Sequence, residues 1–161
     1  MKKTILIAIG LFVVDALVLS MGAMSFIMAL GILFWFLPEV VLLKYRNQSP
    51  KAPLTKIAIY SAMIVAVMIA NAANNMLAKS RAENLVVVIE KYHQSTGHYP
   101  ENLEDLVPAY IPEVPTAKFA VFPTEFRYSN YKDTTLLLYV ATPPFGRVTY
   151  NFNRQSWGYI D

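Results

Sequence analysis

The N-terminal part of the chain is dominated by one long apolar run, residues 4–43, in which Asp15 and Glu39 are the only ionisable residues. A second apolar run, residues 57–70, continues without a proline or glycine into a polar segment. A helix that crosses a bilayer needs roughly 20 predominantly apolar residues. These runs therefore predict a membrane protein, and the residues after 73 have the composition of a small globular domain with a core of its own.

The first run is too long for a single span, because a helix of about 40 residues would be about 60 Å long, twice the thickness of the hydrocarbon core. The small and polar residues at 20–22 predict a turn, which gives helices near 3–20 and 23–43, with Pro38 kinking the second. A third helix is expected to begin near Leu54. A cleaved signal peptide is an alternative for the first residues, but the apolar run resumes at once, which favours a retained hairpin.

The basic residues predict the orientation of these helices. They lie at the N-terminus and in the loop before the third helix, and basic loops stay on the cytoplasmic side: Lys2, Lys3, Lys44, Arg46, Lys51 and Lys56. The C-terminal domain is then expected outside the cytoplasm, in the periplasm of a bacterium, with the helices in the inner membrane and in contact with lipid. This domain has eight basic and nine acidic residues, so the net charge of +3 does not indicate nucleic-acid binding.

Two features of the apolar segments bear on function. Asp15 is the one ionisable residue deep in a span, and it indicates either a proton- or cation-coupled role or, as we favour, a carboxyl group that is protonated or hydrogen-bonded locally. Ala58, Ala62, Ala66 and Ala70 recur every four residues, which is typical of a helix-packing face. This face is expected to contact the first two helices or a partner chain.

The segment 57–96 is expected to form one helix, because an amphipathic stripe of Ala78, Ala82, Leu85, Ile89 and Tyr92 follows the apolar run. After it, the hydrophobic period changes to two, which predicts an antiparallel meander of strands at 126–131, 135–141, 147–152 and 157–160. The candidates for its apolar face are Tyr128, Leu136, Leu138, Val148, Tyr150 and Trp157. The expected fold is membrane α+β, with a transmembrane hairpin and basic loop (1–56), a third transmembrane helix that continues into an exposed helix (57–96) and a β-meander domain (97–161).

The end of the long helix carries a recognisable pattern, formed by Tyr92, Gly97, Tyr99, Pro100, Leu103 and Leu106. With the helix before it and the small sheet after it, this pattern resembles the type IV pilin and pseudopilin family, most closely the major pseudopilin of type II secretion. The resemblance covers roughly residues 57–161 and implies that the glycine ends the helix and the Tyr-Pro pair seats the next segment. That family's leader-cleavage site and first-span glutamate have no counterpart at residues 57–70, so the resemblance implies a fixed envelope module and not a filament subunit.

The sequence contains no recognisable catalytic motif and no cysteine. His93 and His98 flank the helix end, where a solvated terminus is more probable than a metal site. Aromatic residues are too many for one face of a small sheet, so Tyr139, Phe145, Phe152 and Tyr159 are candidates for a partner surface, the alternative being that they build the core. We therefore expect a non-enzymatic protein without metal or cofactor that presents its domain to one or more envelope proteins, as a homo- or hetero-oligomer. An immunity or inhibitor protein and a small subunit of a transport complex are the alternatives.

Overall fold

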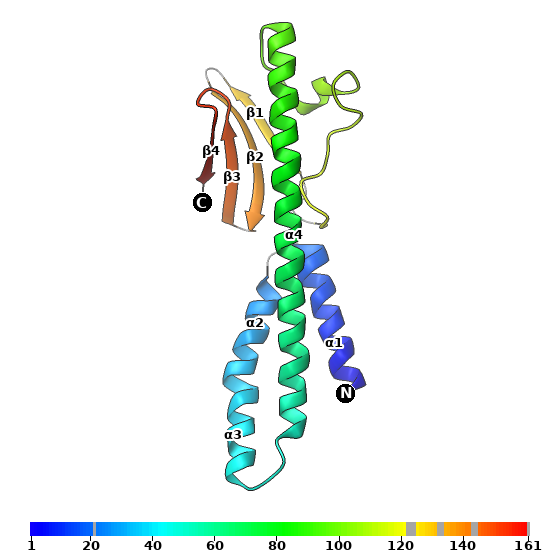
Figure 1. Cartoon of the computed structure of the whole chain (residues 1–161), viewed down its shortest axis with the longest axis vertical. Coiled ribbons are helices and arrows are strands. Elements are labelled where there is room, and N and C mark those ends of the chain that lie inside the picture. Colours follow the sequence, from blue (N-terminus) through cyan, green and yellow to red (C-terminus); the bar gives the residue numbers. More distant parts are fainter. Residues whose placement is uncertain (21, 122–124, 132–133, 143–144, 161) are drawn as a thin grey trace. The chain divides into compact units, whose positions relative to one another are not determined.

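The computed structural model describes residues 1–161 except 21, 122–124, 132–133, 143–144 and 161. The chain divides into two compact units, Met1–Ala72 and Ala73–Asp161. One helix, α4 (Lys51–Thr96), contributes residues to both units (Figure 1). α4 begins at Lys51, before the start expected near Leu54, and has no break where the apolar run ends.

The first unit is mostly helical. Its chain forms one helix up to Leu19, forms a second helix from Ala23 and enters α4 after a short loop. The elements before α4 are α1 (Lys2–Phe12), the π-helical η1 (Val13–Leu19), α2 (Ala23–Gly31), the π-helical η2 (Ile32–Phe36) and α3 (Leu37–Tyr45). Ser20 and Gly22 have left-handed backbones, with φ of 49° and 75°, which reverse the chain at the predicted turn.

The irregularity expected at Pro38 takes the form of the π-helical turn η2, which directly precedes α3. Pro38 has no N–H to donate to the carbonyl of Phe34, and a π-helical turn is a common way to absorb such a defect. The helix therefore continues through the proline without ending.

Within the described residues, two helices are long and apolar enough to cross a membrane, Ala23–Tyr45 and Lys51–Thr96. The segment that forms α1 and η1 is also helical, but it carries Lys2, Lys3 and Asp15. Large apolar side chains cover the outside of this unit and include Leu6, Phe26, Phe34, Trp35, Met68 and Ile69, each more than 60% exposed. An apolar surface of this extent is typical of a protein that contacts lipid.

The second unit contains a four-stranded antiparallel sheet beside the C-terminal part of α4 (Figure 1). Its strands are β1 (Arg127–Tyr131), β2 (Thr134–Thr142), β3 (Phe145–Asn151) and β4 (Ser156–Ile160), in the spatial order β1-β2-β3-β4. The predicted α+β organisation with an antiparallel meander is confirmed. A short 3-10 helix, η3 (Leu103–Leu106), lies between α4 and the sheet in sequence.

The core of the second unit is built on the predicted stripe of α4. Ala78, Ala82, Leu85 and Ile89 are all buried, and they pack with Leu106 and the helix-facing side of the sheet. The helical period of these four residues places them on one face of α4, where two alanines let the neighbouring backbone approach closely.

The predicted apolar face of β2 was wrong by one residue. Leu137 and Tyr139 face the core, whereas Leu136 and Leu138 are only partly buried on the other side. Residues 136–138 are three consecutive leucines, so alternation along the strand does not distinguish the two faces. Trp157 is also 40% exposed, because it lies on the edge strand β4, which has no fully buried residue.

Candidate functional site

The helix-end pattern organises one end of the second unit. Gly97 adopts φ of 80° and its N–H donates to the carbonyl of His93, which ends α4 in a left-handed turn. Pro100 is fully buried, and the Tyr99 ring lies against His93 and Phe152, at centroid distances of 4.0 and 5.3 Å. These contacts give the pattern a role in packing.

The Tyr99 phenol links this turn to the long helix. Its hydroxyl donates to the carboxylate of Glu90 over 3.3 Å. Burial, together with the negative charge of Glu90, raises the pKa of Tyr99 above its usual value of 10.0. The phenol is therefore protonated at neutral pH and acts as a hydrogen-bond donor.

Of the three acidic residues that follow Pro100, only Asp105 stabilises the start of η3 with its side chain. The Asp105 carboxylate accepts the backbone N–H groups of Glu101 and Asn102, both over 2.9 Å, and completes a capping box at the start of η3. Leu103 and Leu106 of this turn are buried in the core. The carboxylates of Glu101 and Glu104 take no part in this capping, and both residues are exposed.

Lys118 is a buried cation that the sequence analysis did not single out. Its side chain is 2% exposed, and Nζ donates to the carbonyl of Ala141 near the end of β2. Burial lowers the pKa of Lys118 to about 8. The signal in the sequence is a single lysine between apolar neighbours in residues 117–122, which the proline-rich surroundings obscure.

The aromatic residues expected on a partner surface occupy different environments. Tyr139 and Phe152 are buried in the core and are corrections to that expectation, because both project from the helix-facing side of the sheet. Tyr159 is 79% exposed on β4. The side chain of Phe145 lies outside the described residues.

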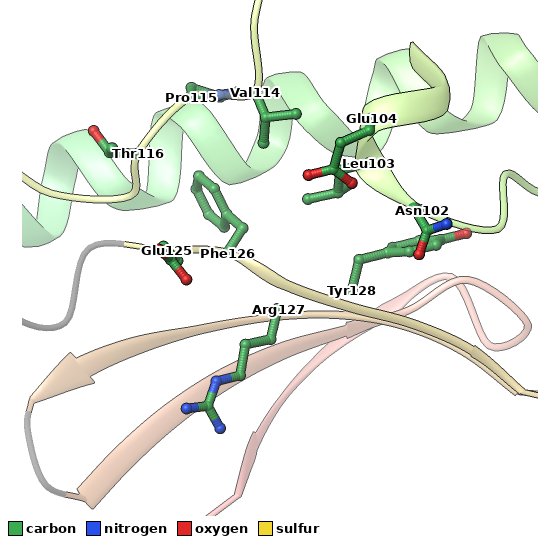
Figure 2. Close-up of a pocket in the computed structure, with 10 residues that line it drawn as sticks. All are labelled: Asn102, Leu103, Glu104, Val114, Pro115, Thr116, Glu125, Phe126, Arg127 and Tyr128. Atoms are coloured by element: carbon green, nitrogen blue, oxygen red, sulfur yellow. The ribbon is translucent and has the colours of Figure 1, made fainter. Parts of the chain in front are cut away.

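A groove of about 620 Å³ lies between the segment after α4 and the beginning of β1 (Figure 2). Leu103 and Phe126, both buried, supply apolar surface, and Glu104 and Glu125 supply carboxylates. The remaining lining residues are Asn102, Val114, Pro115, Thr116, Arg127 and Tyr128. The volume is comparable with the range of about 300–1,000 Å³ that is typical of ligand sites. This groove, called the acidic groove below after Glu104 and Glu125, is a candidate site in the second unit.

In the first unit, Asp15 stabilises the helical hairpin. It is fully buried, and its Oδ2 accepts hydrogen bonds from both the backbone N–H and the Oγ of Ser25, each over 2.8 Å. Ser25 lies in the first turn of α2, where backbone N–H groups have no helical acceptor. The carboxylate thus caps α2 from the preceding helix, a local partner of the kind that the sequence analysis favoured.

The alanine repeat of α4 does not form the buried face of the first unit. Ala58, Ala62 and Ala66 are exposed and Ala70 is only partly buried, whereas Tyr60, Met63 and Val67 are buried against the other helices. Ala70 packs against the buried helical core, and Ala62 and Ala66 line a groove that α1 also lines, so the alanine face lies beside the first helix but is only partly covered. Packing of these alanines against a partner chain stays a prediction.

The described residues contain no group of three or more His, Asp or Glu side chains that would hold a metal ion. His93 and His98 each lie against an aromatic ring instead, Tyr99 and Tyr92 respectively. No protein-family model, curated protein or solved structure matches the chain.

Proposed function

We propose that this chain is a non-enzymatic protein of the bacterial inner membrane that presents a pilin-like periplasmic domain to a protein partner. In this proposal three helices cross the membrane, the N-terminus is cytoplasmic and the domain lies on the opposite side. The assembly that it serves is a pilus, a secretion system or a related envelope complex.

One observation carries the proposal: the first unit exposes many large apolar side chains, such as Phe34 and Trp35, for which lipid is the natural cover. The second unit, to which α4 also contributes, packs most of its apolar residues into a core against the sheet. The first helix of the first unit carries Lys2 and Lys3, and further basic residues lie in and beside the loop before α4: Lys44, Arg46, Lys51 and Lys56. By the positive-inside rule this arrangement supports a cytoplasmic N-terminus and an extracytoplasmic domain.

The assignment to a protein partner is supported by two exposed features of the second unit. Tyr159, Trp157 and Ile160 are apolar side chains on the edge strand β4 that no described residue covers fully. The acidic groove lies on the other edge strand, β1. Edge strands with such surfaces are common sites of protein association.

The proposal is tested by purification of the intact chain from its native membrane in a mild detergent, with a tag after Asp161. We expect one or more envelope proteins to co-purify in a stoichiometric amount. The identity of that protein separates the alternatives, since an immunity protein would carry a toxin and a transport subunit would carry a transporter. A chain that purifies alone and as a monomer would contradict the proposal.

A further inference from the structure

The acidic groove borders a strand edge that is open for pairing. β1 is an edge strand, so alternate backbone N–H and C=O groups point away from β2. Among the described residues, no hydrogen bond from outside the β1–β2 ladder reaches a backbone atom of residues 127–129. The beginning of β1 therefore offers unused backbone donors and acceptors beside the groove.

Three charged residues line this groove, the carboxylates of Glu104 and Glu125 and the cation of Arg127. Figure 2 shows Glu104 on one wall and Glu125 on the other, with the ring of Phe126 between them. The side chains of Arg127 and Phe126 point to opposite sides of the chain, as alternation along a strand requires (Figure 2). The one ion pair of the described residues joins Lys79 to Glu83, so neither groove carboxylate has a cationic partner within this part of the chain.

The neighbouring carboxylate of Asp105, in contrast, already has hydrogen-bond partners. Asp105 is occupied by two backbone N–H groups in the capping box of η3. Glu104 and Glu125 are exposed and free of such bonds, and they lie on opposite sides of an apolar floor made by Leu103 and Phe126. A ligand that complements this surface has an extended backbone, alternating apolar and basic side chains, and a positive charge.

We propose, resting on the function proposed above, that the groove binds an extended basic segment of the protein partner. The segment adds to β1 as a further antiparallel or parallel strand, and its lysine or arginine side chains lie beside Glu104 and Glu125. Backbone hydrogen bonds supply affinity in this mode, while the carboxylates and the apolar floor select the side chains.

The direct test is binding of a fluorescent peptide of alternating valine and lysine to the full chain in nanodiscs of zwitterionic lipid, with empty nanodiscs as the background. We expect saturable binding of the unmethylated peptide. Two further peptides carry N-methyl groups on every second backbone nitrogen, at odd or at even positions. At least one of them should lose binding, because N-methylation removes the N–H groups that pair with an edge strand. The double variant Glu104→Gln/Glu125→Gln should weaken binding by about three- to tenfold at low salt. A peptide of alternating valine and glutamate should not bind.

The matched control is the double variant Glu101→Gln/Glu113→Gln, which removes the same charge from exposed positions that do not line the groove. It should leave the dissociation constant within about twofold of the unmodified chain. Equal weakening by both double variants, or undiminished binding of the methylated peptides, would overturn the proposal.

Co-purification of the native partner tests the groove assignment and the proposed function separately. If the partner co-purifies with the unmodified chain and equally well with Glu104→Gln/Glu125→Gln, the function stands and the groove assignment fails. If no partner co-purifies with the unmodified chain, the proposed function fails, whatever the peptide does. Loss of the partner in the groove variant alone supports both.

Discussion

Lys118 shows how a single side chain can lower the stability of the domain that it helps to close. Its ammonium group is almost fully buried and has one carbonyl acceptor, that of Ala141. A buried charge with incomplete compensation favours the unfolded state, where water solvates it. The pKa of about 8, against the usual 10.5, expresses the same imbalance.

Replacement of this lysine by an apolar residue of similar length should therefore stabilise the domain. Lys118→Met is expected to raise the free energy of unfolding at pH 7 by about 1–2 kcal/mol, measured by near-ultraviolet circular dichroism of the full chain in detergent. Between pH 8 and 10 the unfolded state binds more protons at Lys118, so the unmodified chain gains stability as pH rises and the difference shrinks. Lys91→Met, at an exposed position, is the control. A variant that is less stable at pH 7 would contradict this explanation.

Asp15 is a buried carboxyl group of which one oxygen, Oδ2, accepts two hydrogen bonds, whereas Oδ1 has no partner among the described residues. Because its Oδ2 accepts both the N–H and the Oγ–H of Ser25, an acceptor is required there more than a charge. Asp15→Asn retains a carbonyl acceptor and should change stability little, whereas Asp15→Ala should cost about 0.5–2 kcal/mol, as for other lost helix caps. Thermal unfolding of the detergent-solubilised chain measures both. Equal destabilisation by the two substitutions would show that the charge itself is needed.

At the level of elements, β2 was predicted as a strand, but the alternation of its residues did not predict which of its faces points to the core. The strand and its neighbours were predicted from β-branched and aromatic residues between turn residues, and their order follows from short connections. The inward face was not predictable, because residues 136–138 are all leucine. Only packing against α4 selects Leu137 and Tyr139 for the core.

The two faces of β2 give a matched pair of substitutions. Leu137→Ala removes a fully buried side chain and should cost about 2–5 kcal/mol, including the cavity that it leaves. Leu136→Ala removes the same atoms from a partly exposed position and should cost about 1 kcal/mol or less. Urea unfolding of the two variants compares them directly, and a larger loss for Leu136→Ala would mean that the register is shifted.

Helix boundaries were easier to predict than helix faces. The turn at residues 20–22 follows from the length limit on a span, and the end of α4 follows from Gly97. The alanine repeat was informative only in part, because small residues suit close packing on any neighbour. In this unit the larger Tyr60, Met63 and Val67 are buried, while Ala70 is partly buried against them. Lys118 and the groove carboxylates depend on contacts between segments distant in sequence, which hydrophobic periodicity does not report.

For the whole molecule, the main feature that composition predicts is the difference between an apolar first unit and a second unit of globular composition. The first unit buries few of its large apolar residues, whereas the second has a core that includes Leu85, Ile89 and Phe152. A helix that contributes to both units connects the two environments through an unbroken backbone. We therefore expect that the loop before α4 and the sheet lie on opposite sides of a membrane.

The measurement that tests this expectation most directly uses the absence of cysteine from the chain. Single cysteines are introduced by Gln48→Cys in the loop before α4 and by Arg154→Cys between β3 and β4, both at exposed positions. In bacterial cells with a permeable outer envelope, a maleimide that cannot cross the inner membrane should label position 154 and leave position 48 unlabelled until the membrane is opened. Labelling of position 48 in intact cells, or protection of position 154, would contradict the proposed arrangement.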